Sequence, residues 1–332
     1  MKVKADSDIS IVVEQGDALG FHADVLVLKY ADALHGVDRA AVQSLTAGVP
    51  DIQARLPKPG GFYITPPTDA VGASRVLFVG VGPLRQFGYG EIRRFGRKAL
   101  EALAGEMPRA GHVALTIHGP GYGLDESEAF ASEVAGLLDA IGSGDVPIAL
   151  TTVTIVEQDA GRARRLKTLL DQLLPAGRPG SPSSASRPLT EVPDRLRSVG
   201  YDSQSKPHVF VAMPFADEMD DVFHYGIQGA VNAAGFLCER ADLSTFTGDV
   251  MEWVKTRISS AKLVVADLSD ANPNVYLEVG YAWGCGRPTV LLVKDTSQLK
   301  FDVKGQRCLV YKKIKDLETS LRSELDGLKG VL

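Results

Sequence analysis

Residues 261–283 read Ala261-Lys-Leu-Val-Val-Ala-Asp-Leu-Ser-Asp-Ala-Asn-Pro-Asn-Val-Tyr-Leu-Glu-Val-Gly-Tyr-Ala-Trp283. The run at 263–266 is apolar at every position, which is typical of a strand buried on both faces of a parallel sheet. The Asn-Pro-Asn that follows predicts the start of a helix, with Asn274 as its N-cap. A buried strand that leads directly into a helix indicates an α/β fold.

The same alternation continues on both sides of this stretch. Apolar runs predict further strands at 208–212, 289–293 and 308–311, and helical spacing predicts helices at 221–234, 248–260, 275–284 and 314–325. Ligands of open parallel sheets bind beyond the carboxyl ends of the strands. That rule points to residues 213–215, 267–274 and the chain from Lys294 onward.

The first half of the chain shows a second alternation of this kind. Strands are predicted at 9–13, 25–28, 75–79, 112–117 and 149–155, and helices at 93–107, 124–141 and 160–174. Residues 175–193 are rich in Pro, Gly and Ser, a composition that cannot bury a face and is typical of a linker. We therefore expect one domain over 1–174, a linker over 175–206 and a second domain over 207–332.

Composition narrows the class of function. The formal net charge is −5, which gives no electrostatic reason to bind a nucleic acid backbone. The 3 cysteines have no C-x-x-C spacing, so neither a disulfide framework nor a metal site is expected. No apolar run approaches the roughly 18 residues that span a bilayer, and the first ten residues are too polar for a signal peptide. We expect a cytoplasmic protein with no membrane or nucleic acid partner.

Several motifs of the second half form one pattern: Val209-Phe-Val-Ala-Met-Pro-Phe215, Arg240-Ala-Asp242, the stretch 261–283, and Gly286-Arg-Pro-Thr-Val-Leu-Leu292. Together they resemble the nucleoside deoxyribosyltransferase-like superfamily, and more narrowly the bacterial TIR-like effectors. The resemblance implies a flavodoxin-like parallel-sheet α/β domain. It also implies that Glu278 is the catalytic nucleophile or the stabiliser of a cation, and that Asp267 orients the sugar.

The residue types suit that chemistry. Breaking a glycosidic C–N bond creates an oxocarbenium-like centre that one carboxylate can stabilise or attack while a second holds the sugar hydroxyls. Asp267 at a strand end and Glu278 near a helix start are predicted to face one crevice. The structural alternative is that Glu278 is only a favourable acid in the first turn of a helix.

Other residues of the pattern are candidate substrate contacts. The end of the first strand, 213–215, could hold a base or nicotinamide ring, and Arg240 with Asp242 could bind phosphate or ribose, or form only a surface ion pair. The full predicted substrate-binding set is Met213, Pro214, Phe215, Arg240, Asp242, Ser269, Asn272 and Asn274.

The N-terminal domain has a resemblance of its own. Gly16-Asp17-Ala-Leu, Ala23-Asp-Val-Leu-Val27 and Val76-Leu-Phe-Val-Gly-Val-Gly-Pro83 resemble the macro-like N-terminal domain of the leucyl aminopeptidase family, which implies a mixed or parallel sheet with flanking helices. His118-Gly-Pro-Gly-Tyr-Gly123 is similar to the loop with which macro domains hold the diphosphate of ADP-ribose. Gly119, Gly121, Tyr122 and Gly123 are therefore a candidate regulatory ligand loop, with turn chemistry as the alternative.

These expectations leave several functions open. The first is a nucleotide N-glycosidase, with NAD⁺ as favoured substrate and no other cofactor, regulated by an ADP-ribose-like ligand at the macro-like domain, as in anti-phage defence effectors. The second is a nucleoside or deoxynucleotide 2-deoxyribosyltransferase or hydrolase. The third is a non-catalytic nucleotide-sensing module. TIR-like enzymes often complete their site by self-association, so the resemblance also implies a homo-oligomer.

Overall fold

The computed structural model describes residues 9–31, 34, 36–83, 87–175, 193–240 and 250–328. The chain forms two compact units. The N-terminal unit comprises 1–120 and 126–204, and the C-terminal unit comprises 121–125 and 205–332. Residues 121–125 thus contact the C-terminal unit although the chain on both sides of them belongs to the N-terminal unit.

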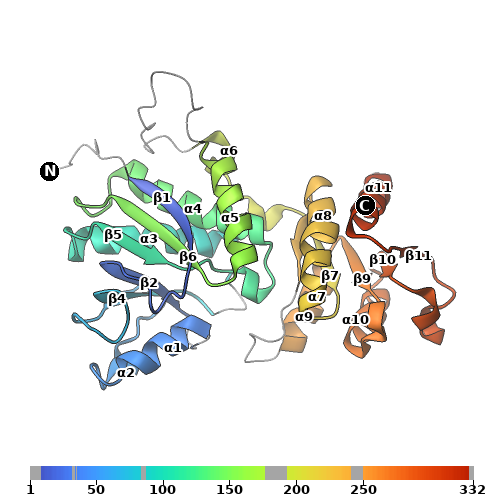
Figure 1. The fold of residues 1–332 in the computed structure, drawn as a ribbon, viewed down its shortest axis with the longest axis horizontal. Coiled ribbons are helices and arrows are strands. Elements are labelled where there is room, and N and C mark those ends of the chain that lie inside the picture. Colours follow the sequence, from blue (N-terminus) through green and yellow to red (C-terminus); the bar gives the residue numbers. More distant parts are fainter. Residues whose placement is uncertain are drawn as a thin grey trace. The chain divides into compact units, whose positions relative to one another are not determined.

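The N-terminal unit is built on a six-stranded mixed sheet in the order β1-β6-β5-β2-β4-β3, in which only the pairing of β3 with β4 is antiparallel. This agrees with the predicted mixed α/β domain (Figure 1). Its strands are β1 (Ser10–Gln15), β2 (Val25–Tyr30), β3 (Phe62–Ile64), β4 (Arg75–Gly80), β5 (His112–Leu115) and β6 (Thr152–Glu157). Its helices are α1 (Gly36–Leu45), α2 (Ile52–Arg55), α3 (Tyr89–Glu106), α4 (Glu126–Ser143), α5 (Ala160–Leu173) and α6 (Asp194–Arg197).

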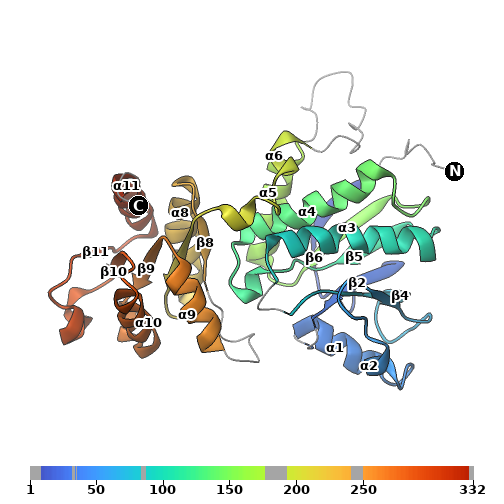
Figure 2. The same cartoon turned by 180° about the vertical axis from the view of Figure 1, so that it is seen from behind.

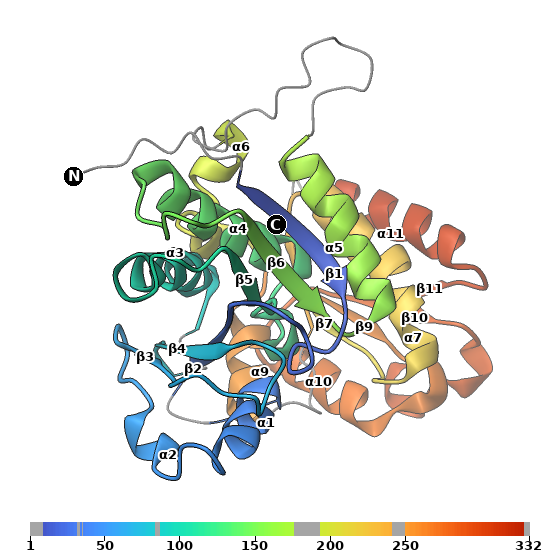
Figure 3. The same cartoon turned by 60° about the vertical axis from the view of Figure 1, so that its left-hand side comes forward.

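Alternating residues of the central strands divide the core of this unit between the two faces of the sheet. Leu26 and Leu28 of β2 pack with Val42 and Leu45 of α1. Successive side chains of a strand point to opposite faces, so the remaining apolar residues of β2 and β4 serve the other face, where α3 contacts β4. Figure 3 shows α3 and α4 side by side, a close approach that Gly136 allows, because a Cβ there would collide with the carbonyl oxygen of Arg93.

The chain at 193–204 differs from the linker expected over 175–206. Arg93 of α3 is almost fully buried, and its Nη1 donates to the carbonyl oxygens of Leu196, Arg197 and Val199 at 3.0, 2.9 and 2.5 Å. The same guanidinium makes a bidentate ion pair with Asp139. Only the planar fork of arginine can serve all these acceptors at once. Residues 176–192 of the expected linker lie outside the described residues.

The C-terminal unit has a five-stranded parallel sheet in the order β11-β10-β9-β7-β8. Counted within the unit, this is the order 5-4-3-1-2 of flavodoxin-like folds, which confirms the predicted fold. Its strands are β7 (His208–Ala212), β8 (Leu237–Glu239), β9 (Leu263–Asp267), β10 (Thr289–Val293) and β11 (Cys308–Val310). Its helical segments are α7 (Asp217–Asp221), η4 (Val222–Gln228), α8 (Gly229–Ala233), α9 (Val250–Ser260), α10 (Pro273–Gly284) and α11 (Ile314–Leu328).

Helices cover both faces of this sheet. On one face, Val211 and Val265 pack with Phe223 of η4 and Leu321 of α11. On the other face, Ala212 and Ala266 pack with α9 and α10 (Figure 2). The helices that follow the neighbouring strands β7 and β9 therefore lie on opposite faces of the sheet. The carboxyl ends of these two strands are the topological switch point, where such sheets bind ligands.

The helix predicted over 221–234 has an unexpected geometry. Residues 222–228 form a π-helix, η4, between two short α-helices. π-Helical turns are rare and are frequent at functional sites. Nothing in the local apolar spacing distinguishes such a turn from an ordinary helix. Of the helices in the described parts of the chain, none combines the length and apolarity needed to cross a membrane.

Arg93→Lys should loosen the segment 193–204 because an ammonium cannot bind Asp139 and three carbonyl oxygens together. We expect a loss of about 2–4 kcal/mol in the free energy of unfolding of the N-terminal unit, as for a damaged buried ion pair, and faster tryptic cleavage after Arg197. Arg94→Lys is the matched control, since Arg94 forms an exposed ion pair with Glu91. Equal cleavage of the two variants would contradict this role of Arg93.

Candidate active site

Asp267 ends the central strand β9 and is fully buried. Its Oδ2 accepts a hydrogen bond from the Tyr311 hydroxyl at 2.6 Å, and its Oδ1 accepts from the Ser269 N–H at 2.9 Å. Burial raises the pKa of this carboxyl above its usual value, against the opposing effect of these hydrogen bonds and of Lys294. Both oxygens of the Asp267 carboxylate therefore accept hydrogen bonds from the protein itself. The bond to Ser269 fixes the start of the loop that leads to α10.

That loop contains the two non-glycine residues of the described chain that have positive φ. Asp270 has φ 62° and Ala271 has φ 49°. L-residues other than Asn and Asp rarely adopt this region, and strain of this kind gathers at functional sites. Ser269 anchors the loop, since its Oγ accepts from the Lys294 N–H at 3.0 Å, and the Asp270 N–H donates to Gln298 at 3.3 Å.

The N-cap of α10 is Asn272, which corrects the prediction of Asn274. The side chain of Asn272 accepts from the Asn274 N–H at 2.9 Å, and Pro273 occupies the first helical position. Proline favours that position because its missing N–H would have no partner there and its φ is already helical. The cap sets the direction of α10 and with it the position of Glu278.

Glu278 lies one turn into α10 and is half-buried. Burial alone raises the pKa of its carboxyl to about 7. Unlike Asp267, it has no hydrogen-bond or ion-pair partner among the described residues. A desolvated carboxyl with a pKa near neutrality is a candidate for acid–base or electrostatic catalysis.

The two carboxyl groups predicted to face one crevice are not paired in the structure. Asp267 follows Val265 by two positions, so its side chain shares the face of η4 and α11, whereas α10 packs against Ala266 on the opposite face. Within the described residues, no interaction joins Asp267 to Glu278. β9 ends at Asp267 and α10 begins at Pro273, so these two elements meet at the carboxyl edge of the sheet.

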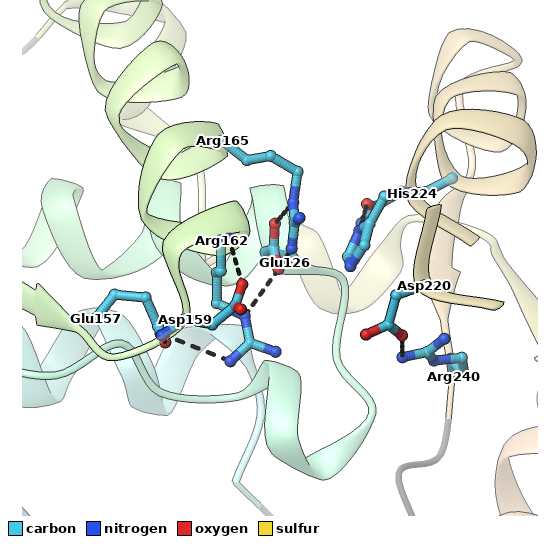
Figure 4. A network of polar contacts seen from close by, with 9 residues as sticks. Glu126, Glu157, Asp159, Arg162, Arg165, Asp220, His224 and Arg240 are labelled. Carbon is cyan, nitrogen blue, oxygen red and sulfur yellow. Dashed lines mark hydrogen bonds and ion pairs between the residues drawn. The ribbon is translucent and has the colours of Figure 1, made fainter. Parts of the chain in front are cut away.

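The remaining predicted contacts gather on the face of η4. Arg240, directly after β8, has its guanidinium 4.1 Å from the Phe223 ring centroid and 5.3 Å from that of Phe215. It also donates to Asp220 at 3.3 Å (Figure 4), and to the sulfur of Met213 at 3.8 Å. Met213 and Pro214 are buried and Phe215 is 42% exposed. Asp242 lies outside the described residues.

Several neighbours of these residues carried no recognisable signal in the sequence. Tyr311 is read from sequence as the last residue of an edge strand, and only the fold shows that it reaches the end of β9. Phe223, which lies under Arg240, was likewise not identified, whereas Lys294, whose Nζ lies 3.3 Å from the sulfur of Met219, begins a segment to which the sequence pointed. Their partners are distant in the chain, so local spacing does not reveal them.

The candidate ligand loop of the N-terminal half is divided between the two units. Gly119 and Gly123 have φ values of 107° and 87°, which favour glycine. Gly121, Tyr122 and Gly123 belong to the C-terminal unit. The following helix α4 begins with Glu126, which accepts from Arg162 at 3.1 Å and from Arg165 at 2.9 Å (Figure 4). An acidic side chain, held by these two arginines, thus already occupies the positive end of α4.

Two surface hollows lie elsewhere. One of about 530 Å³ is lined by residues that include Asp24, Arg75 and Glu106, at the amino ends of strands of the N-terminal sheet. Another of about 380 Å³ follows one side of α11. Neither includes a predicted site residue, and a hollow along a single helix is open to solvent, so the site is defined by chemistry and topology.

No protein-family model matches the chain, and no curated protein matches it. Among solved structures, it is similar to an Oceanobacillus iheyensis macrodomain with MES bound, at 17% identity over 52% of this chain and 96% of that chain, with a TM-score of 0.38. For the same macrodomain with ADP, the identity is 18% over 52% of this chain and 95% of that chain, with a TM-score of 0.39. A Clostridium botulinum CMP N-glycosidase gives 17% identity over 35% of this chain and 98% of that chain, with a TM-score of 0.31. These likenesses are too distant to carry a functional argument.

Tyr311→Phe should destabilise the C-terminal unit, because it removes a donor from a buried carboxylate. We expect a loss of about 1–3 kcal/mol in the free energy of unfolding at pH 7. The loss should shrink as the pH falls and Asp267 becomes protonated, since Tyr311 stabilises the charged form. Thermal melts at pH 7 and pH 4 measure it, and an equal loss at both values would contradict a charged Asp267.

Glu278→Gln should stabilise the protein at alkaline pH. The carboxyl has a pKa of about 7 in the folded state against a reference value of 4.5, so folding favours its protonated form, and stability falls as the pH rises between these values. At pH 8 the amide should therefore be more stable than the wild type by about 1–3 kcal/mol. The difference should vanish below pH 4.5, where both states are protonated; Glu318→Gln on α11 serves as the exposed control.

Proposed function

We propose that the C-terminal unit is an N-glycosidase that breaks the bond between C1′ of a nucleotide sugar and its base, with NAD⁺ as the favoured substrate. The observation that carries the proposal is Glu278: a desolvated carboxyl on α10, beside the switch point of the sheet and beyond a strained loop. Desolvation and strain both cost stability, and such costs are characteristic of sites shaped for chemistry.

The bond changes are simple for NAD⁺. The C1′–N bond breaks, and its electron pair neutralises the pyridinium nitrogen as nicotinamide leaves, so the leaving group needs no proton. The positive charge that develops at C1′ is stabilised by the Glu278 carboxylate, either through space or by formation of an ester. Water then attacks C1′; where an ester has formed, its C1′–O bond breaks and the Glu278 carboxylate leaves with the electron pair. The water loses a proton to solvent or to Glu278. A carboxylate out of bulk water acts strongly on such a charge because the local dielectric constant is low.

The other residues receive supporting roles in this proposal. Asp267, whose oxygens are occupied by Tyr311 and Ser269, acts as a positioning residue for the loop rather than as a second acid. Asn272 orients α10, while Phe215 offers an exposed ring on the opposite side of the switch point. Arg240 carries a positive charge near the end of β8, which suits a phosphate group of the substrate.

Arg240 also favours a second candidate, the hydrolysis or transfer of a deoxynucleoside monophosphate. In that reaction the leaving base is neutral and needs a proton, which a Glu278 of pKa about 7 could supply. The two candidates therefore predict opposite pH dependence for the same residue. NAD⁺ cleavage requires the carboxylate, whereas departure of a neutral base requires the acid.

The N-terminal unit is proposed to regulate this activity by binding an ADP-ribose-like ligand, in a homo-oligomer that acts in anti-phage defence. The support for this part is the joint presence of a macro-like N-terminal sequence and a candidate glycosidase in one chain. A thermal shift with ADP-ribose measures ligand binding, and sedimentation with and without ADP-ribose measures self-association. A monomer that is fully active without the ligand would contradict both the regulation and the homo-oligomer.

Glu278→Gln should lower kcat/KM for nicotinamide release at least about 100-fold, the usual cost of losing one electrostatic stabiliser. Wild-type kcat/KM should rise with pH and level off above about 7, because deprotonation of Glu278 gives the active carboxylate. Chromatography of the released base from NAD⁺, deoxynucleotides and nucleosides measures both effects, with and without ADP-ribose.

Glu318→Gln should leave the rate unchanged, as this acid lies on α11 in an exposed ion pair. Release of a purine or pyrimidine with a rate that falls as pH rises would replace NAD⁺ cleavage by the second candidate. Binding of nucleotides without release of any base, with Glu278→Gln harmless, would favour a sensing module and refute catalysis.

A further inference from the structure

The outer edge of the C-terminal sheet is covered by a segment from the middle of the N-terminal half. Among the strands of the described residues, β8 lies at an edge and pairs only with β7. Its outward Cys238 N–H donates to Asp125 Oδ2 at 2.9 Å, and the outward Arg240 N–H donates to the carbonyl oxygen of Gly123 at 3.2 Å. An edge strand otherwise presents such N–H groups unpaired. We call the segment Gly121–Asp125 the edge clamp.

The edge clamp is held by more than these two bonds. In the amide orientation that satisfies its partners, Asn232 also donates to Asp125 Oδ2 at 2.9 Å. Gly123 packs so closely on Trp253 of α9 that a Cβ would collide with the indole ring, and its φ of 87° independently favours glycine. The Asp125 carboxylate, the Gly123 carbonyl and the absence of a side chain at Gly123 thus all fit the same position of the edge clamp against β8 and α9.

Both ends of the edge clamp continue into the other unit, because 1–120 and 126–204 are N-terminal. Glu126, the next residue after Asp125, is fixed by Arg162 and Arg165 of α5.

We propose that the edge clamp positions Arg240 for substrate. This inference rests on the proposed function in that Arg240 is taken as the phosphate contact. Asp125 is the positioning residue: it fixes the Cys238 N–H, and Gly123 fixes the N–H of Arg240 itself. The guanidinium then lies over Phe223 and beside Asp220 at the end of β8.

The first test is amide hydrogen exchange in the full-length chain. Asp125→Ala should speed exchange at Cys238 and Arg240 about ten- to a hundredfold, as expected when a hydrogen bond to a charged group is lost. The matched control is Asp24→Ala, which removes the same kind of carboxylate from the Gly111 and His112 N–H groups within the N-terminal unit. Unchanged exchange at Cys238 and Arg240 in Asp125→Ala would overturn the proposal. Asp125→Asn keeps the shape of the side chain and replaces Asp125→Ala if that variant does not fold.

Kinetics separates positioning from general stability. Asp125→Ala should raise KM for NAD⁺ about tenfold with kcat nearly unchanged, because Arg240 contributes uniform binding through a phosphate. A variant that is only less stable would instead lose kcat per total protein at constant KM, and that result would overturn the role. If the wild type cleaves nothing while the exchange results hold, the proposed function fails and the edge clamp stands. Turnover with unchanged exchange would instead support the proposed function and overturn the edge clamp.

Discussion

The burial of Asp267 is the constraint on which the C-terminal unit depends. Every residue of β9 is fully buried, and a carboxyl group at the end of such a strand requires hydrogen-bond donors. Tyr311 supplies one from the end of β11, and the backbone of Ser269 supplies another. Since Ser269 also accepts from the Lys294 N–H, one buried group joins the ends of β9, β10 and β11 and sets the path of the loop into α10.

Glu278 gains its chemical character from this arrangement. The path from Asp267 passes through positive φ at Asp270 and Ala271, is capped at Asn272, and leaves Glu278 half-buried with a pKa raised to about 7. Strain and desolvation both oppose folding, and the all-buried sheet offsets them. The same rigidity that tolerates these costs holds Glu278 in place, which is the condition for electrostatic stabilisation of a developing charge.

The edge clamp shows that the two units of this chain are not two separate stretches of sequence. Five residues of the N-terminal half complete the edge of the C-terminal sheet, and Arg93 binds residues 196–199 to the N-terminal unit. If the chain were simply divided at the Pro/Gly/Ser-rich stretch, residues 121–125 and 196–199 would not be assigned to the units that they contact. An edge strand covered by a segment of the same chain is also protected from pairing with other chains.

The sequence by itself determined the local features: the buried strands, the amphipathic helices, the order of elements that gives a flavodoxin-like sheet, and the Asn-Pro start of α10. Two-residue and 3.6-residue periodicity encode these within a few positions. Only the tertiary structure decided that Asp267 and Glu278 come from opposite faces of the sheet, and that residues 222–228 form a π-helix. It also decided two long-range hydrogen bonds: Tyr311 donates to a carboxylate 44 positions away, and Asp125 accepts from a strand 113 positions away. The physical reason is that such contacts depend on which strands pair and on which face of the sheet each connection covers. Neither can be predicted from residues that are neighbours in the chain.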